Sequence, residues 1–533
     1  MKNFIKILIL FVVIGAITTS CLKDLDTVPI DPDQVTSAKV FEDPAAYKQI
    51  LAKLYAGLAV SGQEGPAGNA DISGIDEGFG QYLRGLWYHS ELPTDEAVIS
   101  WNDQTVKDFH WQSWGTSDVF VAAFYYRIFY QIVAVNEFIR ETTDSKLDER
   151  GVSGQLRTDI GYFRAEARWL RALSYWHAMD YFGNVPFVTD ADPVGSFFPE
   201  QISRANLFEY IESELKEIEP LMMDAGTNEY ARADKAAVWM LLAKIYLNAE
   251  VYTGIERNTD CINYCQMIID AGYSLESDYA YLFLADNNLS TNEIIFPVAF
   301  DGVFTRTYGG TNFIIKAGIG GKMNDHLEDY GVNEGWGGTR TTSALVNKFD
   351  DISGDTDERA MFFTEEQNLE INDIGLFTDG YAITKFKNVT REGLPGSDNV
   401  YPDTDFPMFR LADVYLMYAE ATLRGGQGNL GLALEYVNNV RRRAYGGSTE
   451  GEISSNELTL DFILDERARE LYWEGHRRTD LVRFGKFTGG DYLWPWKGNL
   501  KEGRATDAKY DLYPIPDSDI GANPNLVQNS DYY

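Results

Sequence analysis

The chain has 533 residues, of which 44% are hydrophobic and 24% charged, so it can bury large cores without disulfide bonds; its length is that of about three average domains. Its formal net charge of −35 argues against a nucleic-acid ligand, because a phosphate backbone requires a basic surface. Five histidines and three cysteines also leave few arrangements for zinc or nucleophilic chemistry.

The first features in chain order are a targeting signal and a tether. A short basic start is followed by an apolar run over residues 7–17, which is too short to span a membrane. The run ends in TTSC, small residues before a cysteine as in a bacterial lipobox, although a strict lipobox has Leu in place of Thr18. We expect residues 1–20 to be a lipoprotein signal peptide, Cys21 to carry the lipid, and residues 21–36 to form the anchor and tether. The alternative is ordinary cleavage nearby with Cys21 unmodified.

Helices dominate the rest of the chain. Apolar residues at three- and four-residue spacing predict helices over residues 45–59, 119–141, 161–182, 203–223, 235–250, 259–271, 411–423, 430–443 and 460–484. The helix that begins at Gly161 and ends before Gly183 has apolar residues on two faces, so we expect it to be central and buried. Small alanines beside Trp239 and Tyr246 resemble the packing of tetratricopeptide helix pairs.

Other stretches lack helical periodicity. Residues 61–80 and 87–114 are predicted to be loops and short turns, and the end of the chain to be extended. Between residues 286 and 407, one short strand at Glu293–Val298 is followed by a segment rich in glycine, threonine and aromatic residues. The predicted fold is therefore mainly α. It has a helical-repeat scaffold over about 37–285 and 408–490, and an inserted loop-rich lobe with short strands over about 286–407, where binding residues are expected to concentrate.

Several separated stretches resemble the SusD/RagB family. They are FRAEARWLRALSYWHAMDYFGNVPFVT at 163–189, FRLADVYLMYAEA at 409–421, ILDERARELYWEGHRRTDLVRF at 463–484, and YPIP at 513–516 with NPN at 523–525. Together with the lipobox they cover essentially the whole mature chain, so residues 37–533 are identified as one glycan-binding domain of this family.

The resemblance implies a lipoprotein on the outer face of the outer membrane. It implies that the chain binds glycan and delivers it to a SusC-like TonB-dependent transporter, without catalysis. An acidic, aromatic-rich chain suits a neutral ligand stacked on rings, although the charge alone could serve only to keep a secreted protein soluble. Other hypotheses are a peptide or a different glycan as ligand, and a surface glycoside hydrolase, since paired carboxylates are not excluded by composition.

Matching the family's starch-binding founder residue by residue implies a binding site for an α-glucan. The matching positions are Asp76, Arg84, Trp101 with Asn102 beside it, Gln104, Tyr308 and Trp336. Trp101, Tyr308 and Trp336 would stack on sugar rings in an arc, and Gln104 stands where the founder has an asparagine. Alternatively, Asp76 and Arg84 form a structural salt bridge, and the aromatic side chains fill the underside of the lobe.

Oxygen-rich loop residues resemble a calcium-binding region of the founder. They are Asp286, Asn288, Asp403 and Asp405, with Asn288 in place of an aspartate. A structural calcium ion is one interpretation, and turns that need no metal are the other. Cys261 and Cys265, four residues apart on a helix, are expected to be small buried residues, and His476 to be structural.

Overall fold

The computed structural model describes residues 37–62, 65–66, 70–103 and 105–532. The chain divides into two compact units, residues 1–49 and 50–533. The described part of the first unit contains α2 (Ser37–Val40) and the start of α3 (Ala46–Ala59). The signal peptide, Cys21 with its tether, and Gln104 lie outside the described residues, so what the sequence predicts for them stays a prediction.

The second unit is mainly α. Its helices before the lobe are α4 (Tyr82–Ser90), α5 (Asp108–Trp111), α6 (Val119–Glu141), α7 (Asp144–Glu149), α8 (Gly154–Phe182), α9 (Arg204–Ile218), α10 (Lys235–Leu247), α11 (Ala249–Thr253) and α12 (Asn258–Asp270). Those after it are α15 (Leu411–Leu423), α16 (Leu430–Ala444), α17 (Leu460–Leu471), α18 (Arg477–Arg483) and α19 (Asp517–Ala522). Short 3₁₀ segments are η1 (Glu219–Leu221), η2 (Tyr279–Phe283), η3 (Asn287–Leu289), η5 (Thr449–Gly451), η6 (Lys497–Asn499) and η7 (Ala508–Asp511).

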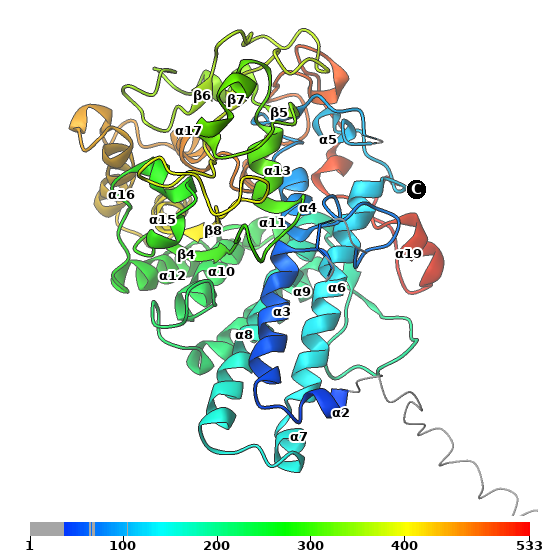
Figure 1. Cartoon of the computed structure of the whole chain (residues 1–533). Coiled ribbons are helices and arrows are strands. Elements are labelled where there is room, and N and C mark those ends of the chain that lie inside the picture. The colour runs from blue at the N-terminus through cyan, green and yellow to red at the C-terminus, as the bar shows by residue number, and fades with distance from the viewer. Residues whose placement is uncertain (1–36, 63–64, 67–69, 104, 533) are drawn as a thin grey trace, which may run out of the picture. The chain divides into compact units, whose positions relative to one another are not determined.

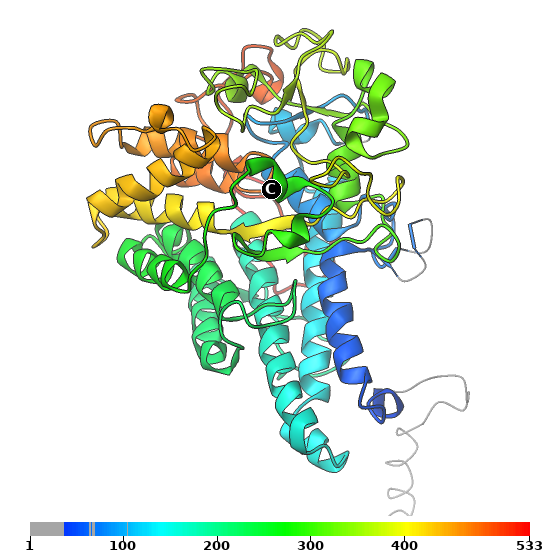
Figure 2. The same ribbon diagram turned by 60° about the vertical axis from the view of Figure 1, so that its left-hand side comes forward.

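The long helices pack against one another in the order in which they follow along the chain. α6 lies along α8, and α8 contacts α9 (Figure 1). A second group follows, in which α12 lies between α10 and α15, and α15 also contacts α16 (Figure 2). Asp118 begins α6 by accepting bonds from the Phe120 and Val121 amides, and Asp234 begins α10 in the same way. The mainly α scaffold of helix pairs is thus confirmed. α8 begins at Gly154, seven residues before the predicted start, and it is largely buried from Ile160 on.

The lobe is inserted between α12 and α15. It contains α13 (Gly310–Ala317), η4 (Gly321–Tyr330) and α14 (Ser343–Val346). Its strands form antiparallel pairs, one of them with a strand from outside the lobe. The pairs are β1 (Val98–Ile99), from the segment between α4 and α5, with β5 (Thr339–Arg340), β6 (Phe362–Phe363) with β7 (Ala382–Ile383), and β4 (Ile294–Val298) with β8 (Phe406–Arg410). A fourth pair, β2 (Val185–Pro186) with β3 (Gln201–Ile202), lies after α8. The β4–β8 pair joins the two ends of the insertion.

Three predictions about local structure were wrong. Trp87 lies in helix α4, not in a loop, and every residue of that helix is buried, so the segment shows no polar face. The helix predicted over residues 460–484 is broken between α17 and α18 because Trp473 adopts a φ of 64°. Its indole packs edge-on against Trp87, with ring centroids 5.2 Å apart. A short helix, α19, also interrupts the predicted extended end.

A buried ionic network connects the lobe to the scaffold. Arg410, at the end of β8, donates to Glu293 at 3.0 Å, to Glu470 at 2.6 Å and to Glu474 at 2.6 Å. Each of these four side chains is at most 1% exposed. The lobe contributes Lys385, which donates to Glu474 at 2.7 Å.

The network extends to further arginines. Arg359, from the lobe, pairs with Glu466 at 2.7 Å and Glu470 at 3.2 Å, both on α17. Arg443, on α16, pairs with Glu293 at 3.1 Å and also with Glu470. Burial by itself would raise the pKa of Glu470, but Arg443, Arg410 and Arg359 outweigh it and lower that pKa to about 2.

We predict that Arg410→Met strongly destabilises the second unit. The substitution leaves buried carboxylates without their main partner, so the free energy of unfolding should fall by about 3–5 kcal/mol. Urea unfolding followed by circular dichroism measures it. Lys486→Met, which removes an ion pair to the exposed Asp461, is the control and should cost less than about 1 kcal/mol. Equal effects of the two substitutions would contradict the importance of the network.

The contribution of Glu470 should depend on pH. Because its pKa is lowered on folding from about 4.3 to about 2, its ionised form stabilises the fold at any pH above about 4.3. That contribution declines as pH falls from about 4.3 and is lost below about pH 2, where the carboxyl becomes protonated in the folded state as well. The stability difference between the wild type and Glu470→Gln should therefore be constant from pH 7 to 5 and shrink between about pH 4 and 2. A difference that does not change with pH would refute this.

Candidate functional site

Three partly exposed aromatic side chains lie next to one another in and beside the lobe. The ring centroids of Trp101 and Trp336 are 6.4 Å apart, and those of Trp336 and Tyr308 are 6.3 Å apart. We call Trp101, Trp336 and Tyr308 the aromatic arc. Five tryptophans of the core differ from it in being at most 1% exposed: Trp87, Trp114, Trp169, Trp473 and Trp494. The structure thus brings together the three predicted stacking residues and leaves each of them partly open to solvent.

Helix α13 holds two residues of the arc, one at each end. At its C-terminus, the amides of Trp336, Gly337 and Gly338 donate to the carbonyls of Lys316, Ile319 and Ala317 at 2.7, 2.7 and 2.8 Å. The loop that carries Trp336 therefore satisfies carbonyls that a helix end leaves free. At its N-terminus, the amide of Gly310 donates to the Gln81 side chain, which fixes the turn just after Tyr308.

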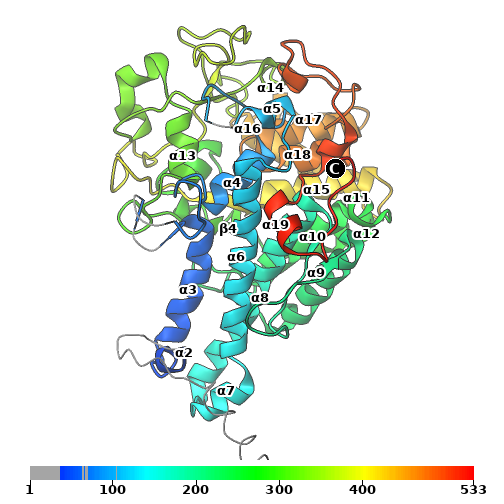
Figure 3. The ribbon, with the colours of Figure 1, turned by 90° about the vertical axis from the view of Figure 1, so that its right-hand side faces the viewer.

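Trp101 is held against the Trp336 loop through the β1–β5 pair. Ser100, just after β1, donates from its amide to the Gly338 carbonyl at 2.9 Å and from its hydroxyl to the Gly337 carbonyl at 2.7 Å. The Trp101 indole donates to the Trp336 carbonyl at 3.2 Å. A Cβ atom at Gly338 would lie 2.6 Å from the Trp101 ring, so this close approach requires glycine. α13 also lies beside α4, the helix that carries Arg84 (Figure 3).

Arg84, on α4, is 4% exposed and serves as a support beneath the arc. Its guanidinium donates to the Tyr308 carbonyl at 3.1 Å and to the Tyr88 hydroxyl at 3.0 Å. It lies 3.9 Å from the centroid of Phe79 and 4.4 Å from that of Phe313. These contacts favour a role in positioning Tyr308. Among the described residues no ion pair joins Arg84 to Asp76, so the salt-bridge alternative does not account for the position of Arg84.

Two of the remaining predicted polar residues, Asp76 and Asn102, have exposed side chains. Asp76 is exposed and accepts the Gly78 amide at 2.9 Å, and Asn102 is exposed and accepts from Lys107. Next to Asp76, Glu77 is 5% exposed and accepts from the Thr307 hydroxyl at 2.7 Å and the Tyr308 amide at 3.3 Å. Burial raises the pKa of Glu77, while these two bonds oppose the rise. Binding roles for Asp76, Arg84, Asn102 and Gln104 stay predictions.

Two residues that lie beside the aromatic arc were not singled out from the sequence. Tyr401 is partly exposed, and its ring centroid lies 5.8 Å from that of Tyr308. The sequence could have indicated an aromatic side chain in a loop here, because Tyr401 stands among turn-forming residues in SDNVYPDTD, as Trp336 stands among glycines. Lys316 is fully buried, 5.6 Å from the Trp336 ring centroid, and donates to Asn333 at 2.7 Å. Nothing in its helical pattern distinguished it from a solvent-facing lysine.

Three of the residues predicted to hold calcium accept hydrogen bonds from backbone amides of the protein itself. Asp403 accepts the Gly302 amide at 2.8 Å, and Asp286 accepts the Arg391 amide at 3.1 Å. Asp405 accepts the Phe300 amide, and burial raises its pKa to about 7, which disfavours a charged ligand. Among the described residues no three Asp, Glu, His or Cys side chains are arranged to hold a metal ion. Calcium stays a prediction, on which no part of the site depends.

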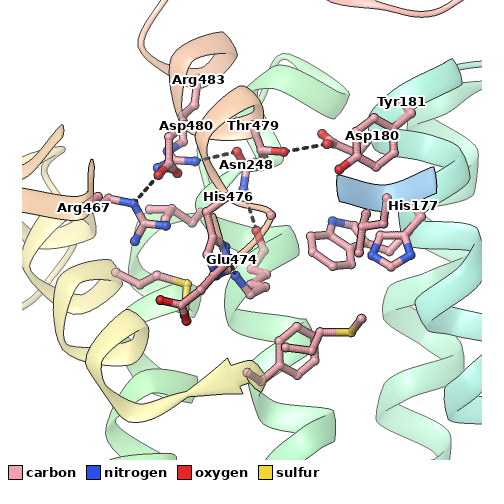
Figure 4. A pocket seen from close by; sticks show the side chains of 18 of the residues that line it. His177, Asp180, Tyr181, Asn248, Arg467, Glu474, His476, Thr479, Asp480 and Arg483 are labelled. Carbon is pink, nitrogen blue, oxygen red and sulfur yellow. Dashed lines mark hydrogen bonds and ion pairs between the residues drawn. The ribbon is translucent and has the colours of Figure 1, made fainter. Parts of the chain in front are cut away.

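A cavity of about 30 Å³ lies inside the scaffold and is too small for a sugar (Figure 4). It has room for about two water molecules. Arg467 donates to Asp480 at 2.7 Å in its wall, and Thr479 donates to Asp180 at 2.7 Å. His476 also lines it, with Nδ1 3.2 Å from the Lys244 ammonium, as a structural histidine would. Elsewhere in the scaffold Cys261 and Cys265 are fully buried, as predicted.

Comparison with known proteins gives consistent matches. Residues 372–533 match a family model described as the SusD family. The chain is 36% identical to the starch-binding protein SusD of Bacteroides thetaiotaomicron, over 98% of both chains. It is 26% identical to the SusD-like protein P25 of Formosa agariphila, over 71% of this chain and 73% of that protein.

Solved structures share the fold. A SusD superfamily protein from Bacteroides vulgatus superposes with a TM-score of 0.69 at 19% identity, over 92% of this chain and 99% of that one. Surface glycan-binding protein A from B. thetaiotaomicron, solved in complex with laminarihexaose, gives a TM-score of 0.65 at 21% identity, over 92% and 99%. Both agree with the mainly α scaffold and its inserted lobe. With a relative 36% identical over nearly its whole length, the chain belongs to the SusD/RagB family.

Proposed function

We propose that the chain is a lipid-anchored glycan-binding protein of the cell surface. It captures α-glucan oligosaccharides on the aromatic arc and delivers them to a SusC-like TonB-dependent transporter in the outer membrane. Capture and delivery involve no bond cleavage. Cys21 carries the lipid that holds the protein beside the transporter.

The arc is the observation that carries the proposal. Aromatic faces pack against the C–H surface of a sugar ring, and neighbouring polar groups bind the hydroxyls. Trp101, Trp336 and Tyr308 contact one another through tilted rings, with interplanar angles of 48° and 57°. Tilted neighbouring rings present a curved surface, and a curved glucan fits such a surface better than a straight chain does.

The choice of an α-glucan as the ligand rests on the similarity of this chain to a starch-binding protein. The starch-binding protein SusD is the relative at 36% identity. The resemblance to the family's starch-binding founder implies that Asp76, Arg84 and the three stacking residues stand at matching positions. The more distant protein solved with laminarihexaose shares the fold at 21% identity, which makes a different glycan the second candidate.

Local chemistry supports binding without hydrolysis. Hydrolysis of a glycosidic bond requires two carboxyl groups on either side of the scissile bond. Glu77 lies directly beneath the arc, but its two oxygens are occupied by the Thr307 hydroxyl and the Tyr308 amide. This carboxylate fixes the Tyr308 loop, and a substrate would have to displace those bonds to use it.

We predict that Trp336→Ala weakens binding of maltoheptaose at least tenfold, because truncating a central ring removes its stacking surface. Isothermal titration calorimetry on the detergent-solubilised chain measures the dissociation constant. Phe198→Ala is the matched control, since this ring is 59% exposed in the loop before β3. The residue contacts the C-terminal segment through its backbone carbonyl, which accepts from the Asn525 side chain and is kept in the variant. The control should bind like the wild type, and the ligand should be recovered uncleaved.

Three outcomes would count against this proposal. Equal binding by Trp336→Ala and the wild type would show that the arc is not the site. Binding of laminarihexaose but not of maltoheptaose would replace the α-glucan with a β-glucan. Shortened products after incubation would make the protein a hydrolase.

We also predict that Cys21→Ala releases the protein from the membrane. Without a thiol at this position no lipid can be attached, and the remaining tether has no comparable apolar anchor. Cell fractionation and labelling with radioactive palmitate measure the effect. Cys265→Ala, at a fully buried thiol, should remain labelled and membrane-bound. Persistent labelling of Cys21→Ala would contradict the assignment of the anchor.

A further inference from the structure

The row of aromatic rings does not end with Tyr308. Tyr401 continues it, with its ring centroid 5.8 Å from that of Tyr308 and an interplanar angle of 49°. This spacing and tilt are close to those within the arc, where centroids are 6.3 and 6.4 Å apart. Tyr401 is partly exposed, like the three rings of the arc. Its surroundings therefore resemble those of a binding residue and differ from those of the buried core aromatics.

A group that can donate hydrogen bonds, the guanidinium of Arg306, lies near the Tyr401 ring. The Arg306 side chain is exposed, and its guanidinium carbon lies 5.8 Å from the centroid of Tyr401. Within the part of the chain that the structure describes, Arg306 forms no ion pair and donates no side-chain hydrogen bond. Its five N–H groups are free to bind hydroxyl groups of a ligand that rests on the Tyr401 ring. Arg84, by contrast, uses its guanidinium to hold the protein's own backbone.

The backbone turns next to both residues are formed without a ligand. The turn that precedes Arg306 is closed by Asp301, whose carboxylate accepts the Val303 amide at 2.8 Å and the Phe304 amide at 2.9 Å. The Gly302 amide donates to Asp403 at 2.8 Å, which ties this turn to the Tyr401 segment. A Cβ atom at residue 302 would lie 2.4 Å from the Tyr401 carbonyl, so only glycine allows this contact.

The Tyr401 segment is closed in a similar way. Asp398 accepts the amides of Val400 and Tyr401 at 2.6 and 3.1 Å. A ring held in place by its own backbone loses little conformational entropy when a ligand stacks on it. A preformed ring beside a free guanidinium has the composition of a sugar-binding subsite.

We propose that Tyr401 and Arg306 form an additional glycan subsite, which extends the aromatic arc and engages the end of a longer oligosaccharide. The inference rests on the proposed function and adds to it a dependence on ligand length. A short ligand is satisfied by Trp101, Trp336 and Tyr308, whereas a longer one also reaches Tyr401. The ligand class is a neutral oligosaccharide, with the Tyr401 ring supplying the stacking face and Arg306 the hydroxyl contacts.

Comparing a short with a long ligand tests the subsite. Maltotriose and maltoheptaose are titrated into the detergent-solubilised full chain, and into Tyr401→Ala, Tyr401→Phe and Arg306→Gln. We expect Tyr401→Ala to weaken maltoheptaose binding about tenfold and to leave maltotriose binding unchanged. Tyr401→Phe keeps the ring and should bind both ligands like the wild type. Arg306→Gln should weaken only maltoheptaose, by a few-fold.

The other possible results of these titrations distinguish failure of the subsite from failure of the proposed function. Unchanged maltoheptaose binding by Tyr401→Ala, together with a loss in Trp336→Ala, overturns the subsite and leaves the proposed function standing. Equal losses for both ligands in Tyr401→Ala also overturn it, because Tyr401 would then only support the arc. If the wild type binds neither ligand, the α-glucan assignment fails and the subsite fails with it. Unchanged maltotriose binding shows that the variants are folded.

Discussion

The buried ionic network around Arg410 and Glu470 is the constraint on which the position of the site depends. The lobe leaves the scaffold at β4 and returns at β8, and these strands alone form only a short pair. Arg410, Lys385 and Arg359 add ion pairs from the returning chain and the lobe to α17 and the segment after it. Each pair is almost fully buried, so its geometry is strongly constrained and a misplaced lobe would leave buried charges unpaired. The network thereby fixes a loop-rich insertion on a helical scaffold.

Within the lobe, α13 positions the side chains of the aromatic arc relative to one another. Its two ends carry the loops of Tyr308 and Trp336, and the β1–β5 pair brings Trp101 to the same place. Arg84 and Glu77 complete the support from the α4 side by binding the backbone of Tyr308 and the hydroxyl of Thr307. The rings are thus held by backbone contacts that do not involve a ligand. Preorganisation of this kind lowers the entropy lost on binding and leaves ring faces free for sugar.

The sequence predicted the long helices well and the site only in part. Helices such as Val119–Glu141 and Leu411–Leu423 have clear periodicity, and their predicted bounds match the structure. Helix α4 was missed because it is buried on all sides, which removes the polar face that periodicity detects. The break at Trp473 was missed because its neighbours Glu470, Glu474 and Arg477 look like a solvated helix surface, although they form buried ion pairs. The stacking residues came from family resemblance, and Tyr401 emerged only when the structure placed it beside Tyr308.

The most direct test of this account is a crystal structure of the protein with maltoheptaose bound. The account predicts glucose rings stacked on Trp101, Trp336 and Tyr308, with little movement of the loops that carry these side chains. An ordered oligosaccharide at another surface, with the aromatic arc unoccupied, would contradict the central claim. So would an oligosaccharide seated in the arc only after α13 and its loops had rearranged.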